Sequence, residues 1–557
     1  MKIKIIALGF AWLALFAAVT TAQAGSEKLS PELRRGTLPE NTEVIVQYKA
    51  SPTEANHDRI VARGGAVLQR FDALRAAHYT VPSSALSEIA NDPDVAYVTP
   101  NRAVHGLLNI TAATVHSDVA NNTYGFTGAG IGVALIDSGI HDEPDFHGGK
   151  NSRIVYQKSF VASSTSVATA TAAVAAGDDQ FGHGTHVAGI IGGNGNGTVY
   201  IGMAPQVSFV DLKVLDANGN GTDASVVAAI LAAINLQNNY NIQVINLSLG
   251  RPVYESYRQD PLCQAVEAAW RAGIVVVVAA GNDGRDNSEN TDGYATITAP
   301  GNDPYVITVG AMKSMGTKTR ADDLIASYSS KGPTLLDHIV KPDIVAPGNQ
   351  VTSVMPAGLT LSNEYPQNQV AGGYFILSGT SMAAPVVTGA AVILLQQNPW
   401  LSPDQVKAKL MKNATKNFPV SSTAVDPVTH IAYTDYYDVF TVGAGYLDIT
   451  AALADTSIPP AFAALSPAVS YIAATGKVTL VGVSGQNVVW GTNVVWGTNV
   501  VWGASAILAN NVVWGTNVVW GTSILQGFNV VWGTNVVWGT STAAGAEVDT
   551  VLINGEP

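Results

Sequence analysis

Cysteine is almost absent from this chain of 557 residues, which contains a single one, Cys263. One thiol cannot form a disulfide within the chain, so the fold is held together without disulfide crosslinks. Charged side chains are also scarce, at 13% of the residues, and the formal net charge of −13 leaves no excess of basic residues. Proteins that bind nucleic acid through its phosphates need such an excess, so we expect no nucleic acid as a partner.

Apolar residues are plentiful, at 47%, which excludes disorder over the whole chain. Residues 1–24 begin with Lys2 and Lys4, continue as an apolar run and end in Ala22-Gln23-Ala24. This pattern predicts a secretory signal peptide cut after Ala24; the alternative, a membrane anchor, fits the short apolar stretch less well. No later segment has the length and apolarity of a membrane span. We therefore expect a mature protein that is secreted, extracellular or periplasmic, and has no membrane span.

Two regions of different character follow the signal peptide. Residues 25–107 alternate strand-like runs, such as 43–48, with helix-like runs at 53–64 and 83–90, which predicts a small α+β unit. Residues 108–455 contain apolar, β-branched runs separated by helical patterns at 223–236 and 261–272; the runs are IGVALID, VSFVDLKVL, IQVINLSLG, IVVVVAAGN and YVITVGA. Short apolar runs between helices are typical of strands buried on both faces of a parallel sheet, so we expect an α/β domain.

The C-terminal part contains a repeat. Residues 456–486, with Pro459 and Pro460, are predicted as a linker, and residues 541–557 as a tail. Between them, residues 487–540 form nine hexads, of which seven start Asn-Val-Val-Trp-Gly and two are degenerate. An even period keeps each side chain on one face of a strand, so the hexads predict a β-rich array. A low-complexity tract prone to cross-β association and a docking module for surfaces or glycans remain open alternatives.

Two polar residues stand out at the start of the larger region. Asp137 ends the apolar run 131–136, and ligands of parallel sheets bind beyond the carboxyl ends of strands. A buried cap or salt-bridge partner is the alternative for this carboxylate. His183 lies between Gly182 and Gly184, which lets the backbone approach a partner closely. His183 and His186 could instead bind a metal, but the sequence offers neither a third ligand nearby nor the glutamate of a zinc-peptidase helix.

A third polar residue, Ser381, lies in the segment Ser378-Gly379-Thr380-Ser381-Met382-Ala383-Ala384-Pro385. A helix of small residues is predicted from Val386 to Gln397. Ser381 would then lie at a helix N-terminus, where backbone N–H groups stabilise developing negative charge. An ordinary N-cap serine is the alternative when this residue is taken alone.

Together, the segments GTSMAAP, HGTHVAG and VALIDSG resemble the subtilisin-like serine peptidase family, also called the subtilases, over residues 108–455. The residues occur in the order Asp137, His183, Ser381, which is the subtilisin order of a catalytic triad. The resemblance implies a three-layer α/β fold with a mostly parallel central sheet and a secreted endopeptidase of broad specificity acting on protein or peptide substrates. It implies that Ser381 is the nucleophile, His183 the general base and then acid, and Asp137 the residue that orients the imidazole.

The same resemblance implies further site residues. Asn282, in Val278-Ala279-Ala280-Gly281-Asn282, matches the asparagine of the oxyanion hole, although a turn residue is the alternative for it in isolation. Ser248-Leu249-Gly250 matches the segment that pairs with the substrate backbone, with Ser248, Leu249 and Gly250 as binding residues.

A prodomain and a calcium ion are also implied. Residues 43–107 resemble the inhibitory prodomain of the family, most clearly at 92–98, so we expect a zymogen that cuts itself near Leu107 and is inhibited by its own prodomain. Asp145 and Asn196 stand where some members bind a structural calcium ion, and oxygen ligands on a glycine-rich loop suit that ion. No cofactor is expected to take part in the chemistry itself.

Two other functions compete with this interpretation. The repeat could make the protein a surface or fibrillar element whose peptidase domain serves mainly in its processing. The same triad could also transfer the acyl group to another peptide, although hydrolysis needs only water and is the simpler expectation.

Overall fold

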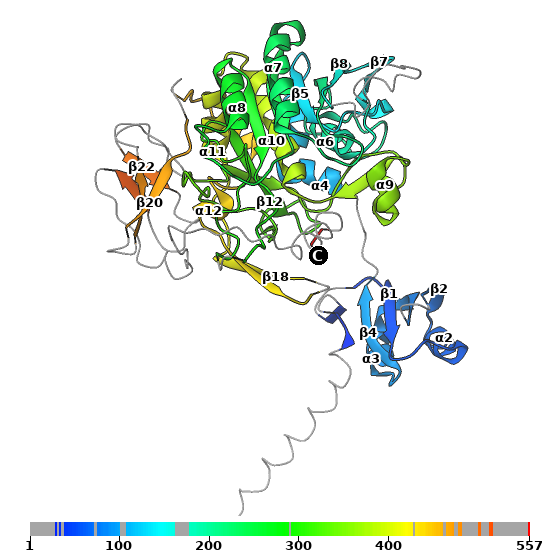
Figure 1. The fold of residues 1–557 in the computed structure, drawn as a ribbon. Helices are drawn as coiled ribbons and strands as arrows, with labels where there is room; N and C mark the ends of the chain where they lie inside the picture. Colours follow the sequence, from blue (N-terminus) through cyan, green and yellow to red (C-terminus); the bar gives the residue numbers. More distant parts are fainter. Residues whose placement is uncertain are drawn as a thin grey trace, which may run out of the picture. The chain divides into compact units, whose positions relative to one another are not determined.

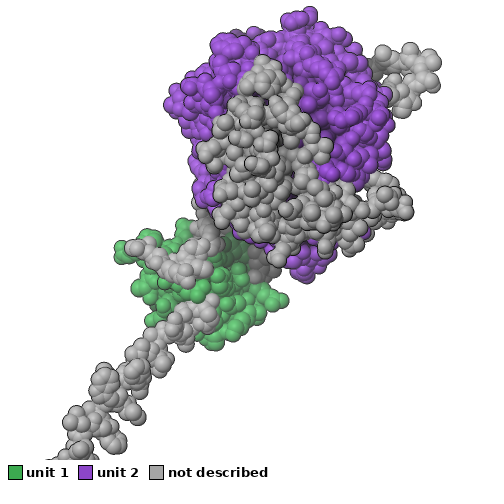
Figure 2. Space-filling model, turned by 90° about the vertical axis from the view of Figure 1, so that its left-hand side faces the viewer, with its two compact units in different colours: residues 1–105 green, residues 106–557 purple. Residues whose placement is uncertain are grey.

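The computed structural model divides the chain into two compact units, residues 1–105 and 106–557, which Figure 2 colours separately. The structure describes residues 28–30, 33–34, 38–71, 75–100, 107–161, 178–288, 291–426, 429–459, 464–472, 477–481, 499–502, 512–515 and 555–556. The predicted signal peptide and most of the predicted repeat array lie outside the described residues.

The first unit contains an antiparallel sheet in the order β2-β3-β1-β4. Its elements are β1 (Asn41–Tyr48), α2 (Glu54–Val61), β2 (Ala66–Phe71), β3 (Ala76–Pro82), α3 (Leu86–Asn91) and β4 (Val95–Pro100). Buried and exposed residues alternate along most of β1, as expected for a sheet covered on one face. Val44, Tyr79, Ile60 and Ile89 belong to its single apolar cluster. The predicted helical runs at 53–64 and 83–90 are confirmed.

A central sheet of eight strands organises the second unit (Figure 1). The order is β13-β12-β11-β10-β5-β9-β8, with β14 also paired to β12. All neighbouring pairs are parallel except β12 with β13. The strands are β5 (Gly132–Asp137), β8 (Ile154–Ser159), β9 (Ser208–Lys213), β10 (Ile242–Leu247), β11 (Val275–Ala279), β12 (Ile307–Lys313), β13 (Leu324–Ile325) and β14 (Ile344–Pro347). The mostly parallel sheet expected from the sequence is confirmed.

The five apolar runs found in the sequence form β5, β9, β10, β11 and β12. Every residue of β5, β11 and β12 is buried, which explains why these runs are continuous rather than alternating. β-Branched residues such as Val275 to Val278 favour this extended, fully covered geometry. The strands form the centre of one large apolar core.

Two pairs of helices cover the sheet. Helices α7 (Asp223–Tyr240) and α8 (Pro261–Arg271) pack together, with α7 against β5, β9 and β10 and α8 against β11. Helices α6 (His183–Gly192) and α10 (Thr380–Gln397) also pack together, with α6 against β5 and α10 against β10, β11, β12 and β14. α10 begins six residues earlier than the predicted Val386. Its length and hydropathy would suit a membrane span, but 83% of that window is buried, as in a core helix.

The remaining elements surround this core. The helices are α4 (Leu107–Thr114), α5 (Ser117–Asn122), α9 (Thr360–Glu364), α11 (Pro403–Asn413), α12 (Val439–Val442) and α13 (Ile449–Ala454). Small antiparallel sheets are formed by β6 (His147–Gly148), β7 (Asn151–Ser152), β15 (Val351–Val354), β16 (Gln369–Val370), β17 (Tyr374–Leu377), β18 (Ser421–Val425) and β19 (Ala432–Tyr436).

The segment predicted as a linker is more structured than expected. β20 (Ala468–Ile472) and β21 (Lys477–Val481) form an antiparallel hairpin. The buried Ser466 hydroxyl lies 2.9 Å from Lys407 Nζ, so the segment is bound to α11 before the hairpin begins. Within the hexads, β22 (Asn499–Trp502) pairs antiparallel with β23 (Val512–Gly515). The array as a whole stays a prediction.

Candidate active site

Asp137 is the last residue of β5 and lies at the carboxyl edge of the sheet between β9 and β10. Its side chain is fully buried. Oδ1 accepts hydrogen bonds from His183 Nδ1 at 2.7 Å and from the backbone N–H of Ser138 at 2.8 Å. Oδ2 has no hydrogen-bond partner among the described residues. A buried carboxylate is stabilised by such charge-assisted bonds, so its position favours an imidazole that donates from Nδ1.

His183 is the first residue of α6, and the two flanking glycines allow its close approach to β5. Gly182 has φ of 108°, a left-handed conformation that favours glycine. A Cβ on Gly184 would lie 2.2 Å from the carbonyl oxygen of Gly139, just beyond Asp137. The interpretation of these glycines as close-approach positions is therefore confirmed.

Asp179 is a positioning residue that the sequence analysis missed. Its Oδ1 accepts the N–H groups of Phe181 and Gly182, at 3.0 Å and 2.8 Å. Its Oδ2 accepts the N–H of Thr185 at 2.9 Å and the Thr185 hydroxyl at 2.7 Å. These bonds fix the loop before His183 and the first turn of α6. The signal available in the sequence was an aspartate four residues before the histidine.

Burial and charge act in opposite directions on His183. Burial of the imidazole disfavours its charged form, but the carboxylates of Asp137 and then Asp179 favour it, and the pKa of His183 is raised above its ordinary value. Burial, followed by the neighbouring His183, lowers the pKa of His186 to about 3. His186 Nε2 lies 3.1 Å and 3.0 Å from the carbonyl oxygens of Val351 and Phe375. His186 therefore serves as a neutral structural donor, and no group of three metal-ligating side chains occurs among the described residues.

Ser381 is the second residue of α10, after Gly379 with φ of 141°. The hydroxyl of Ser381 donates to the carbonyl oxygen of Ser248 at 3.1 Å, and the Ser248 hydroxyl donates to the carbonyl oxygen of Ser381 at 2.8 Å. Pro385 lacks the N–H that would bond this carbonyl in a regular helix, which leaves the oxygen available to Ser248. Among the described residues, no hydrogen bond joins Ser381 Oγ to His183.

Asn282 follows the carboxyl end of β11 and contacts the residue before Ser381. Its Oδ1 accepts the backbone N–H of Thr380 at 2.9 Å and lies 3.0 Å from the Thr380 hydroxyl. With the oxygen held in this way, the Nδ2 amide group remains available as a donor, and no partner for it is found in the described parts of the chain. A fixed amide beside a serine hydroxyl at a helix N-terminus suits the stabilisation of an oxyanion.

Ser248, Leu249 and Gly250 follow the end of β10 at the same edge. Ser248 is buried between Ser381 and Asn246, whose Nδ2 donates to the Ser248 hydroxyl at 3.0 Å. Thr388 of α10 donates to Asn246 Oδ1 at 2.8 Å, which completes a buried network that the sequence analysis missed. The next residue, Arg251, pairs with Ala299 through backbone hydrogen bonds of 3.0 Å and 2.8 Å.

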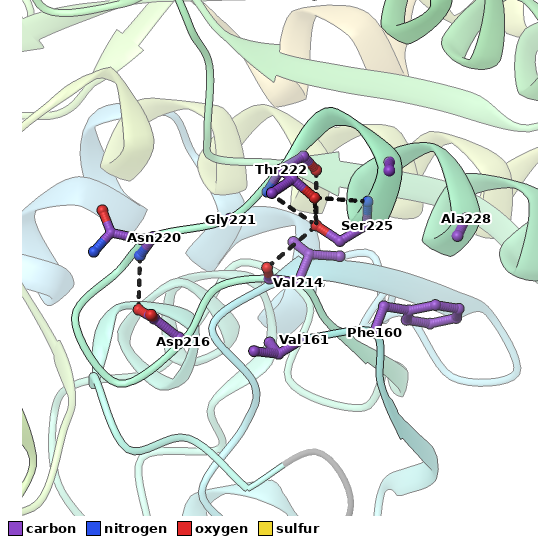
Figure 3. A pocket seen from close by; sticks show the side chains of 10 residues that line it. Phe160, Val161, Val214, Asp216, Asn220, Gly221, Thr222, Ser225 and Ala228 are labelled. Atoms are coloured by element: carbon purple, nitrogen blue, oxygen red, sulfur yellow. Dashed lines mark hydrogen bonds between the residues drawn. The ribbon is translucent and has the colours of Figure 1, made fainter. Parts of the chain in front are cut away.

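A cavity of about 420 Å³ lies where β8 and β9 end and α7 begins (Figure 3). Strand β9, which ends at this cavity, pairs with β5, the strand that ends at Asp137. The apolar lining of the cavity includes Phe160, Val161 and Val214. Thr222 caps α7 by accepting the Ser225 N–H, and the Ser225 hydroxyl donates to the carbonyl oxygens of Thr222 and Val214 (Figure 3).

The candidate calcium ligands lie on neighbouring segments, since the N–H of Asn194 donates to the carbonyl oxygen of Asp145 at 2.9 Å. Asp145 Oδ1 and the Gly195 carbonyl oxygen lie 2.8 Å and 3.1 Å from the Tyr374 hydroxyl, which supplies one proton to this pair. That hydroxyl also accepts a hydrogen bond from Thr198 at 3.1 Å. Asn196 is exposed, and its backbone N–H bonds to Asn194. Burial raises the pKa of Asp145. Calcium takes six to eight oxygens, whereas the Tyr374 hydroxyl already bonds Asp145 Oδ1 and the Gly195 carbonyl, so the described residues favour a hydrogen-bonded loop over an ion site. The calcium expected from the sequence has yet to be tested with a chelator.

The family profile and the similar proteins that match this chain all point to the same protein family. The profile described as "Subtilase family" (Peptidase_S8) matches residues 128–428. The serine protease AprX of Bacillus subtilis (strain 168) is 35% identical over 67% of this chain and 82% of its own length. Subtilisin E of the same strain is 32% identical over 72% and 93%, and the extracellular serine proteinase of Thermus sp. (strain Rt41A) is 34% identical over 62% and 72%. A solved cold-adapted subtilisin-like serine proteinase aligns at 31% identity over 53% of this chain and 85% of its own, with a TM-score of 0.39, too low to inform the fold.

Proposed function

The chain belongs to the subtilase family and is a subtilisin-like serine endopeptidase, and we propose that Asp137, His183 and Ser381 carry its chemistry. The observation that carries this assignment is the 2.7 Å hydrogen bond between Asp137 Oδ1 and His183 Nδ1. Because Nδ1 bonds Asp137, His183 Nε2 is the ring atom that can accept the proton of the Ser381 hydroxyl. His183 and Ser381 lie at the N-terminal ends of α6 and α10, two helices that pack against each other.

The proposed reaction begins when the Ser381 hydroxyl turns from the Ser248 carbonyl toward His183 Nε2. Catalytic hydrogen bonds are often looser without substrate, so this change of rotamer is in keeping with the geometry. Nε2 takes the hydroxyl proton while Oγ attacks the scissile carbonyl carbon. His183 then donates that proton to the leaving amine, and the same steps with water release the acyl group. Asp137 holds the imidazole in the required tautomer and stabilises its charged form.

The negative charge of the tetrahedral intermediate requires donors at its oxygen. Asn282 Nδ2 is the proposed side-chain donor, because Thr380 already occupies Asn282 Oδ1. The backbone N–H of Ser381 is the proposed second donor, since the first N–H groups of a helix have no partner within it.

The substrate is proposed to be an extended protein or peptide segment. Ser248, Leu249 and Gly250 are its proposed binding residues, since they follow β10 at the edge that carries the triad. Main-chain pairing depends little on side chains, which favours broad specificity.

Secretion and self-processing complete the proposal. The apolar leader at residues 1–24 supports export, and the extracellular relative from Thermus is in keeping with it. Residues 25–107 are proposed as an inhibitory prodomain that the enzyme cuts from itself near Leu107. The division of the chain between His105 and Gly106 supports a cut in this region.

The assignment is tested by casein hydrolysis with purified protein. Ser381→Ala is expected to lower kcat on the order of 10⁶-fold, the loss measured for the nucleophile of subtilisin itself. Ser362→Ala, which removes a buried hydroxyl in α9, is the matched control and should retain activity. Casein hydrolysis by Ser381→Ala at the wild-type rate would refute the assignment of Ser381 as the nucleophile, whereas no hydrolysis by the wild-type protein would favour a mainly structural role for the chain.

A further inference from the structure

The penultimate residue of the chain, Glu556, is buried in the second unit with 2% of its surface exposed. Its Oε1 lies 2.9 Å from Arg285 Nη2 and accepts the N–H of Ser327 at 2.9 Å as well as the Ser327 hydroxyl. Its Oε2 lies 2.9 Å from Lys313 Nζ. A single carboxylate thus meets two cations and a serine within the protein.

The backbone of Glu556 is held as firmly as its side chain. Its N–H donates to Asn349 Oδ1 at 2.9 Å, and its carbonyl oxygen accepts from Asn349 Nδ2 at 2.8 Å. One asparagine side chain therefore bonds both main-chain groups of the residue. A strand added to a sheet edge is likewise held by both main-chain groups of a residue. The two bonds therefore fix the position of the backbone in addition to that of the charge.

The buried Lys313 pairs directly with the Glu556 carboxylate. Arg285 Nη1 also pairs with Asp426 at 2.8 Å, so the arginine has a second carboxylate. Lys313 is 5% exposed, and Glu556 is its only ion-pair partner within the described parts of the chain. A buried ammonium without a counter-charge is strongly unfavourable. The buried Asp435 also interacts with Lys313, but it pairs directly with Lys331 at 2.6 Å, so Glu556 supplies the direct counter-charge of Lys313.

The preceding residue adds a requirement of shape. Gly555 has φ of 73°, in the left-handed region. A Cβ there would lie 2.5 Å from Gln350 Cγ, 2.7 Å from Ser378 Oγ and 3.1 Å from Asn349 Oδ1. Both the backbone conformation and the surrounding atoms accept glycine and reject larger residues.

The site also adjoins the segment that leads to Ser381. Ser378 Oγ accepts the N–H of Gln350 at 2.8 Å, and the N–H of Gly379 donates to the carbonyl oxygen of Gly348 at 2.8 Å. Gln350 precedes β15, whose first residue offers its carbonyl oxygen to His186. Residues 349–350 thus touch the C-terminal end on one side and the turn before the nucleophile on the other.

We propose that Arg285, Lys313, Ser327 and Asn349 form a binding site for the Gly555-Glu556 dipeptide of the same chain, which anchors this dipeptide to the peptidase unit beside the Ser381 turn. The anchor holds Glu556 to the same unit that contains β21, which ends at Val481. It adds to the peptidase function a carboxylate-recognition site that takes no part in the triad.

The shape requirement gives the first test, by thermal unfolding of the full chain carrying Ser381→Ala to prevent autolysis. Gly555→Ala is compared with Gly316→Ala. Gly316 has φ of 70°, and a Cβ added to it would have no atom within 4 Å. Both variants place alanine at a similar positive φ, but only Gly555→Ala fills the site. We expect its fall in unfolding temperature to be at least twice that of Gly316→Ala. A Gly555→Ala variant with the unfolding temperature of the parent would overturn the proposal, because an undocked end would tolerate alanine.

The charge requirement gives the second test, in the same background. Glu556→Gln and Lys313→Met are each expected to lower the unfolding temperature, because the first leaves the buried Lys313 without its ion-pair partner and the second leaves Glu556 Oε2 without a cation. The double variant should lose less than half of the sum of the two shifts, since neither charge then remains. Glu364→Gln, at an exposed glutamate, is the control and should cause no shift. Additive shifts, or no shift for Glu556→Gln, would contradict the proposal; neither outcome depends on peptidase activity.

Discussion

At the scale of single residues, two carboxylates control the protonation of His183. In the proposed mechanism the imidazole acts as general base only when neutral, so kcat/KM is expected to fall as the pH drops below the pKa of His183. Asp137 and Asp179 raise that pKa by stabilising the charged ring. The acidic limb of the pH profile therefore lies higher than it would for an ordinary histidine.

Asp179→Asn is predicted to shift the acidic limb of the kcat/KM profile to lower pH. Removing this negative charge destabilises the imidazolium, which lowers the pKa of His183 and keeps the base neutral at more acidic pH. The measurement is kcat/KM against pH with a neutral peptide substrate. Asp178→Asn is the matched control, because Asp178 pairs with His141 instead. A shift to higher pH, or equal shifts in both variants, would contradict this role of Asp179.

Asn282→Ala is predicted to lower kcat by on the order of 10²–10³ with little change in KM, because the amide acts on the transition state. That magnitude was measured in subtilisin, a member of the same family, and is carried over. Steady-state kinetics on one peptide substrate would measure it, with Asn363→Ala in α9 as a control. A rise in KM at unchanged kcat would show that Asn282 binds substrate and not the oxyanion.

At the scale of elements, the sequence predicts five of the eight strands of the central sheet, because a strand that is buried on both faces forms a continuous apolar run. The runs that became β5, β9, β10, β11 and β12 are apolar and β-branched, and this depends only on local composition. The predicted start of α10 is six residues too late: the helix continues through Pro385, because Ser248 satisfies the carbonyl that the proline leaves free.

Contacts that join distant segments could not be predicted from one sequence. Asn246 and Thr388 meet across the interface of β10 and α10, and Tyr374 meets Asp145 from 229 positions away. Nothing in the local pattern around these residues marks them. The triad is proposed because its three motifs resemble a family, and not because their spacing in the sequence indicates that the side chains lie together.

The loop around Asp145 gives a prediction about calcium. We expect a chelator to leave the unfolding temperature of the protein unchanged, because the Tyr374 hydroxyl already bonds the oxygens that an ion would need. Tyr374→Phe should lower the unfolding temperature, since it leaves the buried Asp145 Oδ1 without this donor. Tyr365→Phe, outside this network, is the control. A lower unfolding temperature in chelator would instead establish a structural calcium ion.

At the scale of the whole molecule, the chain is expected to mature by removing its first unit. Mass spectrometry of the secreted protein should find an N-terminus within several residues of Leu107, whereas Ser381→Ala should keep residues 25–107 attached. Ser362→Ala should mature normally. A mature N-terminus before Val44 would refute the prodomain, and cleavage of the Ser381→Ala chain at the same site would assign the cut to another protease.

The proposed triad can be tested most directly by mapping the residue that a fluorophosphonate labels in the mature protein. If the hydroxyl is activated by the Asp137–His183 pair, peptide mass spectrometry will find the adduct on Ser381, and His183→Ala will abolish it although the serine is still present. An adduct on a different serine, or labelling of Ser381 at the same rate without the imidazole, would contradict the mechanism.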